Sequence, residues 1–69
     1  MTNTAKLNDY IERSGLKKSY IANALGIRSS TLSRKINNAQ GFMADEISVL
    51  CGLLGIDSLE DKEAIFFAS

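Results

Sequence analysis

The sequence contains no proline, no histidine and no tryptophan, and its only cysteine is Cys51. A single cysteine cannot form an internal disulfide or a zinc cage, so we expect a reducing, cytoplasmic setting and no bound metal. Without histidine, proton transfer would depend on carboxylates or lysines in a deep cleft, and a chain of 69 residues rarely builds one. We therefore expect no enzyme activity, no cofactor and no site for a small-molecule ligand.

Long hydrophobic runs are also missing. No apolar run approaches the ~20 residues that cross a membrane, and the N-terminal residues lack the basic-then-apolar pattern of a signal peptide. Residues 1–69 are few enough to form one domain, and 45% of them are hydrophobic, which supplies one compact core and excludes disorder. We expect a single domain that does not contact a membrane.

Acidic side chains are absent from the whole stretch between Glu12 and Asp45. Residues 1–40 contain seven basic and two acidic side chains, a net charge of +5, whereas residues 41–69 contain one basic and six acidic side chains, a net charge of −5. The zero net charge of the chain therefore conceals a basic half and an acidic half. This asymmetry suggests a polyanion that binds the first half, although a solvated basic face is an equally ordinary interpretation.

The residues that are abundant are typical of helices. Leucine and alanine are frequent, valine occurs once, and no segment alternates between apolar and polar residues. Apolar side chains instead recur at helical spacing in five segments, three of which are followed by Gly15, Gly26 and Gly55. We expect an all-α fold with helices at about residues 4–14, 18–25, 29–37, 43–54 and 59–66.

Residues 18–37, with the sequence KSYIANALGIRSSTLSRKIN, form the most informative segment. Two short helices are joined by a turn of three to four residues, Gly26 lies where the chain reverses, and Ala22 is small where the helices cross. The apolar side chains that hold the pair on one core are Leu25, Ile27, Leu32 and Ile36. This pattern describes a helix-turn-helix, whose second helix can lie in the major groove of DNA.

The same segment resembles the helix-turn-helix of the XRE family, which includes the Cro proteins and repressors of temperate phages. The positions that match the family's small residue, turn glycine and core aliphatics are Ala22, Gly26, Ile27, Leu32 and Ile36. The resemblance extends over all five expected helices. It implies a lambda-repressor-like domain and a sequence-specific transcriptional regulator, a dimeric Cro-like repressor of phage or prophage type that reads an inverted repeat in double-stranded DNA.

The outward face of the expected recognition helix is polar. Resemblance to the family places four side chains at base-reading positions: Ser29, Ser30, Ser33 and Arg34. Arg34 can donate two hydrogen bonds to the O6 and N7 atoms of a guanine, whereas serine hydroxyls donate or accept and are less selective. Helix-start chemistry is the alternative role for the serines, because serine favours N-cap positions.

A second group of side chains is expected to contact phosphates, in part because the N-terminus of the second helix offers free N–H groups to an anion. The group consists of Lys17, Lys18, Ser19, Arg28, Thr31, Lys35, Asn37 and Asn38, and the Thr31 methyl can also touch a thymine methyl. Lys17 and Arg28 occupy the expected N-cap positions of the second and third helices, where a cation opposes the helix dipole unless phosphate is bound. Alternatively, these helices begin at Ser19 and Ser29, and the whole group is an ordinary solvated surface.

Ile65, Phe66 and Phe67 are three consecutive large apolar residues. Either they fold back onto the core of the monomer, or they meet a second copy across a two-fold axis. Resemblance to Cro-like regulators favours a dimer interface, which would place two helix-turn-helix units on half-sites about one turn, ~34 Å, apart. Cys51 lies on the apolar stripe of its helix and is expected to be a small core residue.

Two other functions fit the same pattern. An antitoxin-like protein-interaction module would use the same fold, with the acidic half holding a protein partner. A non-specific architectural DNA binder is disfavoured by the zero net charge and by the absence of basic tails. Sequence-specific DNA binding by a homodimer is the leading interpretation.

Overall fold

Apolar side chains at helical spacing form five helices in the computed structural model, which describes residues 1–68. Their bounds are α1 Thr4–Ser14, α2 Lys18–Leu25, α3 Ser29–Ile36, α4 Ala44–Leu54 and α5 Leu59–Phe66. No strand occurs in these residues. The predicted all-α, five-helix fold is therefore confirmed, and each helix begins and ends within one residue of its predicted position.

Two of the helix ends show why glycine follows them. After α2, Gly26 has φ 72°, and its N–H donates a hydrogen bond to the carbonyl of Asn23. The N–H of Ile27 donates to the carbonyl of Ala22 at 3.0 Å. Glycine adopts this left-handed conformation without steric cost, and the two bonds satisfy carbonyls that the helix leaves free. Gly55 ends α4 in the same way, at φ 71°.

The N-terminal ends of the helices differ in how they are capped. Asn3 and Ser58 cap α1 and α5, each by accepting a hydrogen bond from a backbone N–H three residues later. Before α2 and α3, Lys17 and Arg28 have the extended backbone of N-cap residues but make no side-chain cap hydrogen bond. Lys17 and Arg28 are therefore the N-cap residues, as predicted, and both helices lack the side-chain cap that α1 and α5 possess.

One hydrophobic core contains side chains from every helix. Its buried members are Leu7, Ile11, Ile21, Ala22, Leu32, Ile36, Leu50, Cys51, Leu54, Ile56, Ile65 and Phe66. Leu25 and Ile27 pack against this core while partly exposed. Cys51 is a core residue, as predicted, and burial raises the pKa of its thiol although the positive charge of Lys62 opposes this. Leu25, Ile27, Leu32 and Ile36 thus hold α2 and α3 on one core, as predicted.

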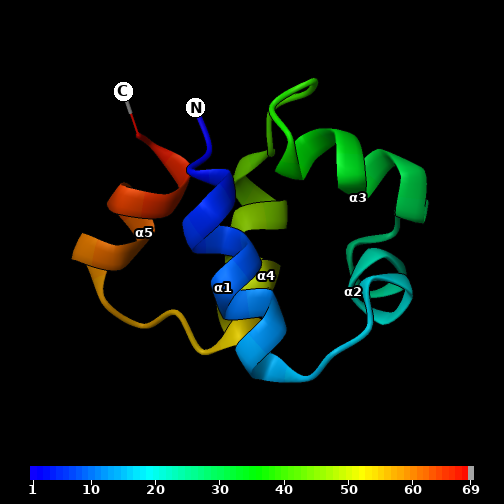
Figure 1. The fold of residues 1–69 in the computed structure, drawn as a ribbon, viewed down its shortest axis with the longest axis horizontal. Coiled ribbons are helices and arrows are strands. Elements are labelled where there is room, and N and C mark those ends of the chain that lie inside the picture. The colour runs from blue at the N-terminus through cyan, green and yellow to red at the C-terminus, as the bar shows by residue number, and fades with distance from the viewer. Residues whose placement is uncertain (69) are drawn as a thin grey trace.

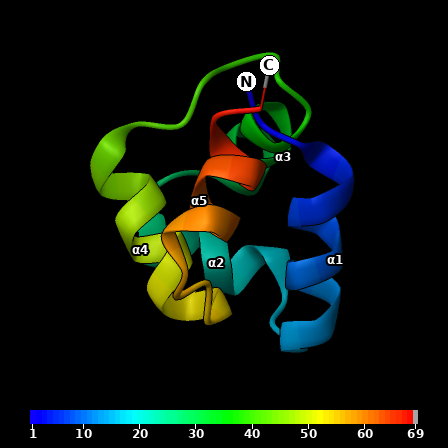
Figure 2. The ribbon, with the colours of Figure 1, turned by 90° about the vertical axis from the view of Figure 1, so that its left-hand side faces the viewer.

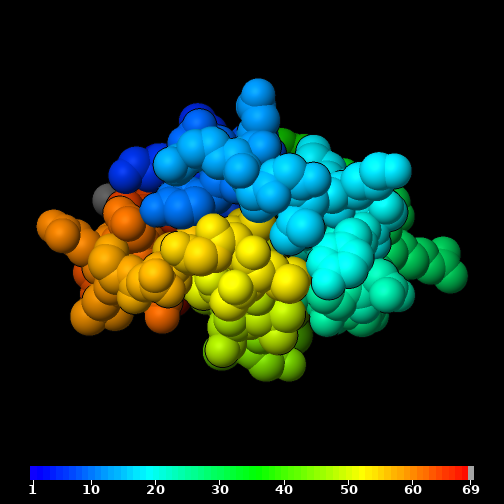
Figure 3. Space-filling model, turned by 90° about the horizontal axis from the view of Figure 1, so that it is seen from below, coloured from blue at the N-terminus to red at the C-terminus, as the bar shows by residue number. Residues whose placement is uncertain are grey.

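The helices α2 and α3 lie at one end of the molecule and α5 lies at the other (Figure 1). Between these ends stand α1 and α4, and α2 packs against both α3 and α4. Figure 2 views the molecule from the α5 end and shows α5 in front of α2 and α3. From below, the C-terminal part of α4, in yellow, separates α2 from α5 (Figure 3). The domain measures 27 × 24 × 21 Å, and none of the helices in residues 1–68 has the length and apolar character to cross a membrane.

The three consecutive apolar residues at the end of α5 have different environments. Ile65 and Phe66 are 0% and 4% exposed, and the Phe66 ring meets the ring of Phe42 edge to face, with centroids 5.7 Å apart. The prediction that Ile65 and Phe66 form a dimer interface is therefore wrong, because α5 turns both side chains into the core of its own chain. Phe67 is 66% exposed and is the one member of the three that a second copy can contact.

An extended segment before α1 is bonded to the end of α3. The side-chain amide of Asn38 accepts a hydrogen bond from the N–H of Thr2 and donates one to its carbonyl, each at 2.8 Å. The hydroxyl of Thr4 donates to the carbonyl of Ile36 at 2.6 Å. Asn38 has φ 68°, and no other residue in the described range except glycine has a positive φ. These bonds hold the C-terminal end of α3 against the start of α1.

We expect Asn38→Ala to lower the free energy of unfolding by about 2–3 kcal/mol, because it removes two hydrogen bonds and places alanine in left-handed backbone. Asn38→Gly loses the same hydrogen bonds but adopts the conformation freely, so its loss should be about 1 kcal/mol smaller. Urea denaturation followed by circular dichroism measures both. Equal losses of stability in the two variants would show that the left-handed backbone at position 38 has no energetic role. Unchanged stability in Asn38→Ala would show that the hydrogen bonds of the Asn38 amide do not contribute either.

Candidate nucleic-acid interface

Four exposed basic side chains gather at the end of the molecule that α2 and α3 form. Lys17 and Lys18 lie at the start of α2, Arg28 lies in the turn before α3, and Arg34 lies on α3. Neither helix contains an acidic residue. A polyanion that approaches this end therefore meets positive charge, and α2 and α3 themselves bring no carboxylate to oppose it.

The backbone at the start of α2 and α3 adds to this charge. Since Lys17 and Arg28 make no cap, the first N–H groups of both helices have no side-chain acceptor within the described part of the chain. Uncapped helix N-termini carry partial positive charge and can donate hydrogen bonds to anions. Ser19 adds an exposed hydroxyl in the first turn of α2. Both helix starts are suited to phosphate groups.

The third helix has one apolar and one polar face. Leu32 and Ile36 are buried in the core. The exposed side chains are Ser29, Ser30 and Arg34, and the half-buried ones are Thr31 and Ser33. Three of the four predicted base-reading residues are therefore open to solvent, while Ser33 lies at the border with the buried face.

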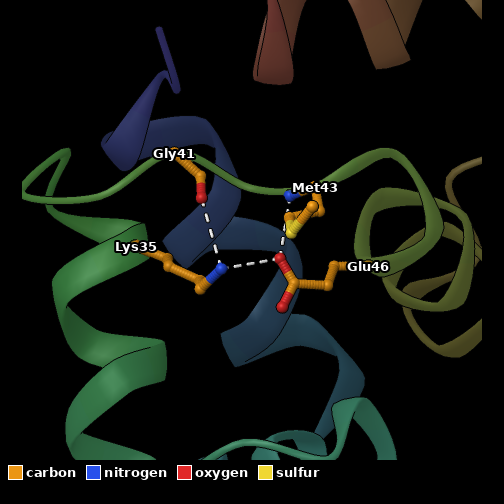
Figure 4. Close-up of polar contacts among 4 residues, drawn as sticks. All are labelled: Lys35, Gly41, Met43 and Glu46. Carbon is orange, nitrogen blue, oxygen red and sulfur yellow. Dashed lines mark hydrogen bonds and ion pairs between the residues drawn. The ribbon is translucent and has the colours of Figure 1, made fainter.

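Lys35 does not belong to this surface. Only 6% of the residue is exposed, and its Nζ donates hydrogen bonds to Oε1 of Glu46 at 2.7 Å and to the carbonyl of Gly41 at 3.2 Å (Figure 4). The backbone N–H of Met43 donates to the same carboxylate oxygen at 2.8 Å. The predicted phosphate contact of Lys35 is wrong, because its position three residues after Leu32 places it on the buried side of α3.

The carboxyl group of Glu46 is held in its charged form. Burial by itself raises the pKa of Glu46, but hydrogen bonds from Lys35 and from the N–H of Met43, together with the Lys35 charge, lower it below the ordinary value of 4.5. A carboxyl group with a lowered pKa stabilises the folded protein above its unfolded pKa. That contribution is lost as the pH falls through the folded pKa.

We therefore expect the free energy of unfolding to decrease as the pH is lowered below about 4.5, in part through protonation of Glu46. In Glu46→Gln the side chain keeps an acceptor oxygen but no longer titrates, so the decrease over the same range should be smaller. Urea denaturation midpoints of the two proteins, taken at intervals from neutral to acidic pH, measure the difference. Parallel pH profiles would show that Glu46 does not contribute to acid sensitivity.

The two asparagines that follow α3 have different roles. Asn37 is exposed and stays a candidate phosphate contact. The amide of Asn38 is bonded on both sides to the backbone of Thr2, and its Nδ2 also lies 3.5 Å from the hydroxyl of Thr4. The assignment of Asn38 to phosphate is therefore corrected to a structural one, since its donors are already used within the fold.

The acidic side chains in and just before α5 lie at the other end of the molecule. Exposed carboxylates in and just before α5 are Asp57, Glu60 and Glu63, and α5 lies opposite α2 and α3 (Figure 1). Asp61 accepts a hydrogen bond from the Tyr10 hydroxyl at 3.1 Å. Arg13 is paired with Asp9 at 2.9 Å and lies 4.7 Å above the Tyr10 ring. The exposed carboxylates of residues 57–63 thus lie away from α2 and α3, whereas Asp45 and Glu46 lie at the start of α4, and Glu46 is bonded to Lys35 of α3.

Sequence reasoning missed two parts of this arrangement. Glu46 was not recognised as the partner of Lys35, although the helical spacing from Leu32 placed Lys35 on the core-facing side. The bonds between Asn38 and Thr2 join residues 36 positions apart, and no local pattern contains such a contact. Both omissions concern polar groups that the fold turns inward.

No pocket, and no cluster of three or more potential metal-ligating side chains, occurs in residues 1–68. No protein-family model, no curated protein and no solved structure matches the chain. The candidate interface is therefore defined by the charge and geometry of this chain alone.

Proposed function

We propose that this protein is a sequence-specific regulator of transcription that binds double-stranded DNA through α3 in the major groove. The observation that carries the proposal is that α2, α3 and the turn between them bring together exposed basic residues, uncapped helix starts and a polar face of α3. An α-helix with such a face fits the major groove. The protein acts in the cytoplasm as a repressor that covers a promoter, without catalysis, cofactor or small-molecule ligand.

Each exposed side chain of this end has a distinct part in the proposal. Arg34 reads a guanine through its two donor groups, and Ser29, Ser30 and Ser33 make less selective contacts to neighbouring bases. The proposed phosphate contacts are Lys17, Lys18, Ser19, Arg28, Thr31 and Asn37. These contacts position α3 in the groove but carry no direct sequence information.

Two copies of the domain are part of the proposal. The domain is 27 Å long, which is less than the ~34 Å between half-sites one helical turn apart. One copy therefore reads one half-site, and a pair related by a two-fold axis reads an inverted repeat. Phe67, which is exposed directly after α5, is the proposed contact between the copies.

Titration of isotope-labelled protein with a short duplex of mixed sequence tests where DNA binds. At low salt we expect the largest amide shift changes at residues 17–19 and 28–34, and small changes along α5. Lys18→Ala should weaken this binding, whereas Lys6→Ala, which removes an exposed lysine from α1, should leave it nearly unchanged. Shift changes that centre on α5, or equal effects of the two variants, would contradict the proposed interface.

A further inference from the structure

The ion pair between Lys35 and Glu46 is largely withdrawn from water. Their side chains are 8% and 12% exposed, and the charged atoms are 2.7 Å apart. Taking two charges out of water carries a large desolvation cost, and apolar side chains of similar volume often give equal or greater stability. A contribution to stability therefore does not explain why the fold contains this ion pair. Its location in the fold suggests a different role.

The pair joins three segments at one point (Figure 4). Lys35 belongs to the last turn of α3, Gly41 to the connection that follows, and Glu46 to the first turn of α4. Lys35 donates hydrogen bonds to the carbonyl of Gly41 and to the carboxylate of Glu46, and the N–H of Met43 donates to the same carboxylate. The end of α3 is thereby tied to the start of α4.

This connection directly borders the residue proposed to read a base. Arg34 precedes Lys35, and the carbonyl of Arg34 accepts the N–H of Ala39 at 2.8 Å. The chain that leaves α3 therefore folds back on the turn that carries Arg34, and the lysine at position 35 fastens that chain again at Gly41. A rotation of the last turn of α3 would stretch or misalign these hydrogen bonds.

We propose that Lys35 and Glu46 are positioning residues that set the rotation and depth of α3 for base reading, while neither touches DNA. Leu32 and Ile36 hold α3 on the core, but apolar contacts are not directional and tolerate small rotations of a helix. Charge-assisted hydrogen bonds are short and directional, so they select one orientation. The pair therefore acts on sequence discrimination through Arg34.

The test compares variants that separate stability from orientation. Lys35→Met leaves a buried carboxylate without its partner and should lower the melting temperature by about 10 °C or more. The double variant Lys35→Met with Glu46→Leu removes both charges and should melt within about 5 °C of the wild type. Glu46→Gln keeps an acceptor oxygen for both donors but leaves the buried Lys35 ammonium without its counter-charge, so it should also melt below the wild type. Measured below its melting temperature, it should preserve the orientation of α3, which makes it the control for hydrogen-bond geometry.

The readout is the ratio of dissociation constants for two duplexes, the one most enriched by the wild-type protein from a random library and a scrambled version of it. We expect the double variant to lose about tenfold in this ratio, and Glu46→Gln to stay within about twofold of the wild type. The dependence of binding on salt should be unchanged in both, because no phosphate contact is removed. Lys18→Met is the matched surface control and should reduce the salt slope by about 0.9.

Three results overturn the proposal. A folded double variant with wild-type discrimination would show that the pair only fills space. A reduced salt slope in that variant would show that Lys35 contacts phosphate. If the double variant does not fold, Glu46→Gln decides. A folded Glu46→Gln variant keeps the hydrogen bonds, so a tenfold loss of its sequence discrimination would show that these hydrogen bonds do not set the orientation of α3. The positioning role of Lys35 and Glu46 rests on the proposed function. Absence of any sequence preference in the wild-type protein would overturn the proposed function and the positioning role together, whereas the three results above overturn the positioning role alone.

Discussion

Replacing Phe66 with alanine is expected to lower the free energy of unfolding by about 3–5 kcal/mol. The ring is 4% exposed and packs edge to face on Phe42, so its removal leaves a cavity between α5 and the connection before α4. A domain of 69 residues rarely has more than about 3–5 kcal/mol to lose, so the variant should be largely unfolded. Urea denaturation and thermal melting measure this directly.

Phe67 supplies the matched control for this prediction. The side chain is 66% exposed, so Phe67→Ala should change the free energy of unfolding by no more than about 0.5 kcal/mol. Sedimentation should instead show a lower dimer fraction if Phe67 joins two copies. A stable, folded Phe66→Ala variant would contradict the packing of α5, and an unchanged dimer fraction in Phe67→Ala would remove Phe67 from the proposed interface.

The second large effect is expected for Arg34→Ala on DNA. Loss of a two-donor contact to guanine should reduce discrimination at one base of each half-site by about 1–3 kcal/mol, or roughly 5- to 150-fold. Affinity for a duplex that already lacks that base should change far less. Binding measured on a set of single-base variants of the enriched duplex tests this position by position.

Lys18→Ala is the control for Arg34→Ala, because the two residues have different proposed contacts. Removal of a phosphate contact should weaken binding to all sequences alike and reduce the salt slope by about 0.9, with no change in base preference. Identical losses on matched and scrambled duplexes for both variants would contradict the division into base-reading and phosphate-contacting residues.

The boundaries of the helices were predictable because their signals are local. Gly15, Gly26 and Gly55 follow the last turn of three helices, and each has the positive φ that ends a helix. Ser58 caps α5 by accepting a hydrogen bond from the N–H of Asp61, three residues later. Such signals depend on three or four neighbouring residues, so a single sequence contains them.

The errors arise where long-range packing decides the role of a polar or apolar group. Lys35 is a cation in a basic segment, which favours a solvated side chain, whereas its spacing from Leu32 favours the buried side of α3. Its burial depends on a carboxylate eleven residues later in another helix. Phe66 and Phe67 are chemically identical neighbours, and only the rotation of α5 against the core decides which one is buried. Local patterns give conflicting signals for Lys35 and equal ones for the two phenylalanines, and the packing between helices decides.

The lack of caps on α2 and α3 is consistent with a site built for an anion. A capping side chain is worth ~1 kcal/mol, yet α2 and α3 begin after a lysine and an arginine that make no cap. A cation at a helix N-terminus opposes the dipole in the free protein, whereas a bound phosphate would satisfy both the N–H groups and the charge. On the proposed function, stability of the free domain would be exchanged for affinity toward a polyanion.

Selection of a random duplex library on the purified protein, followed by sequencing, tests the central claim most directly. The proposed function predicts an enriched inverted repeat whose half-site centres lie about one helical turn apart. Substituting Arg34 should then remove the preference at one position of each half-site. A folded protein that enriches no sequence at moderate salt would contradict sequence-specific DNA binding, and would leave the basic α2–α3 end as the docking site of another partner.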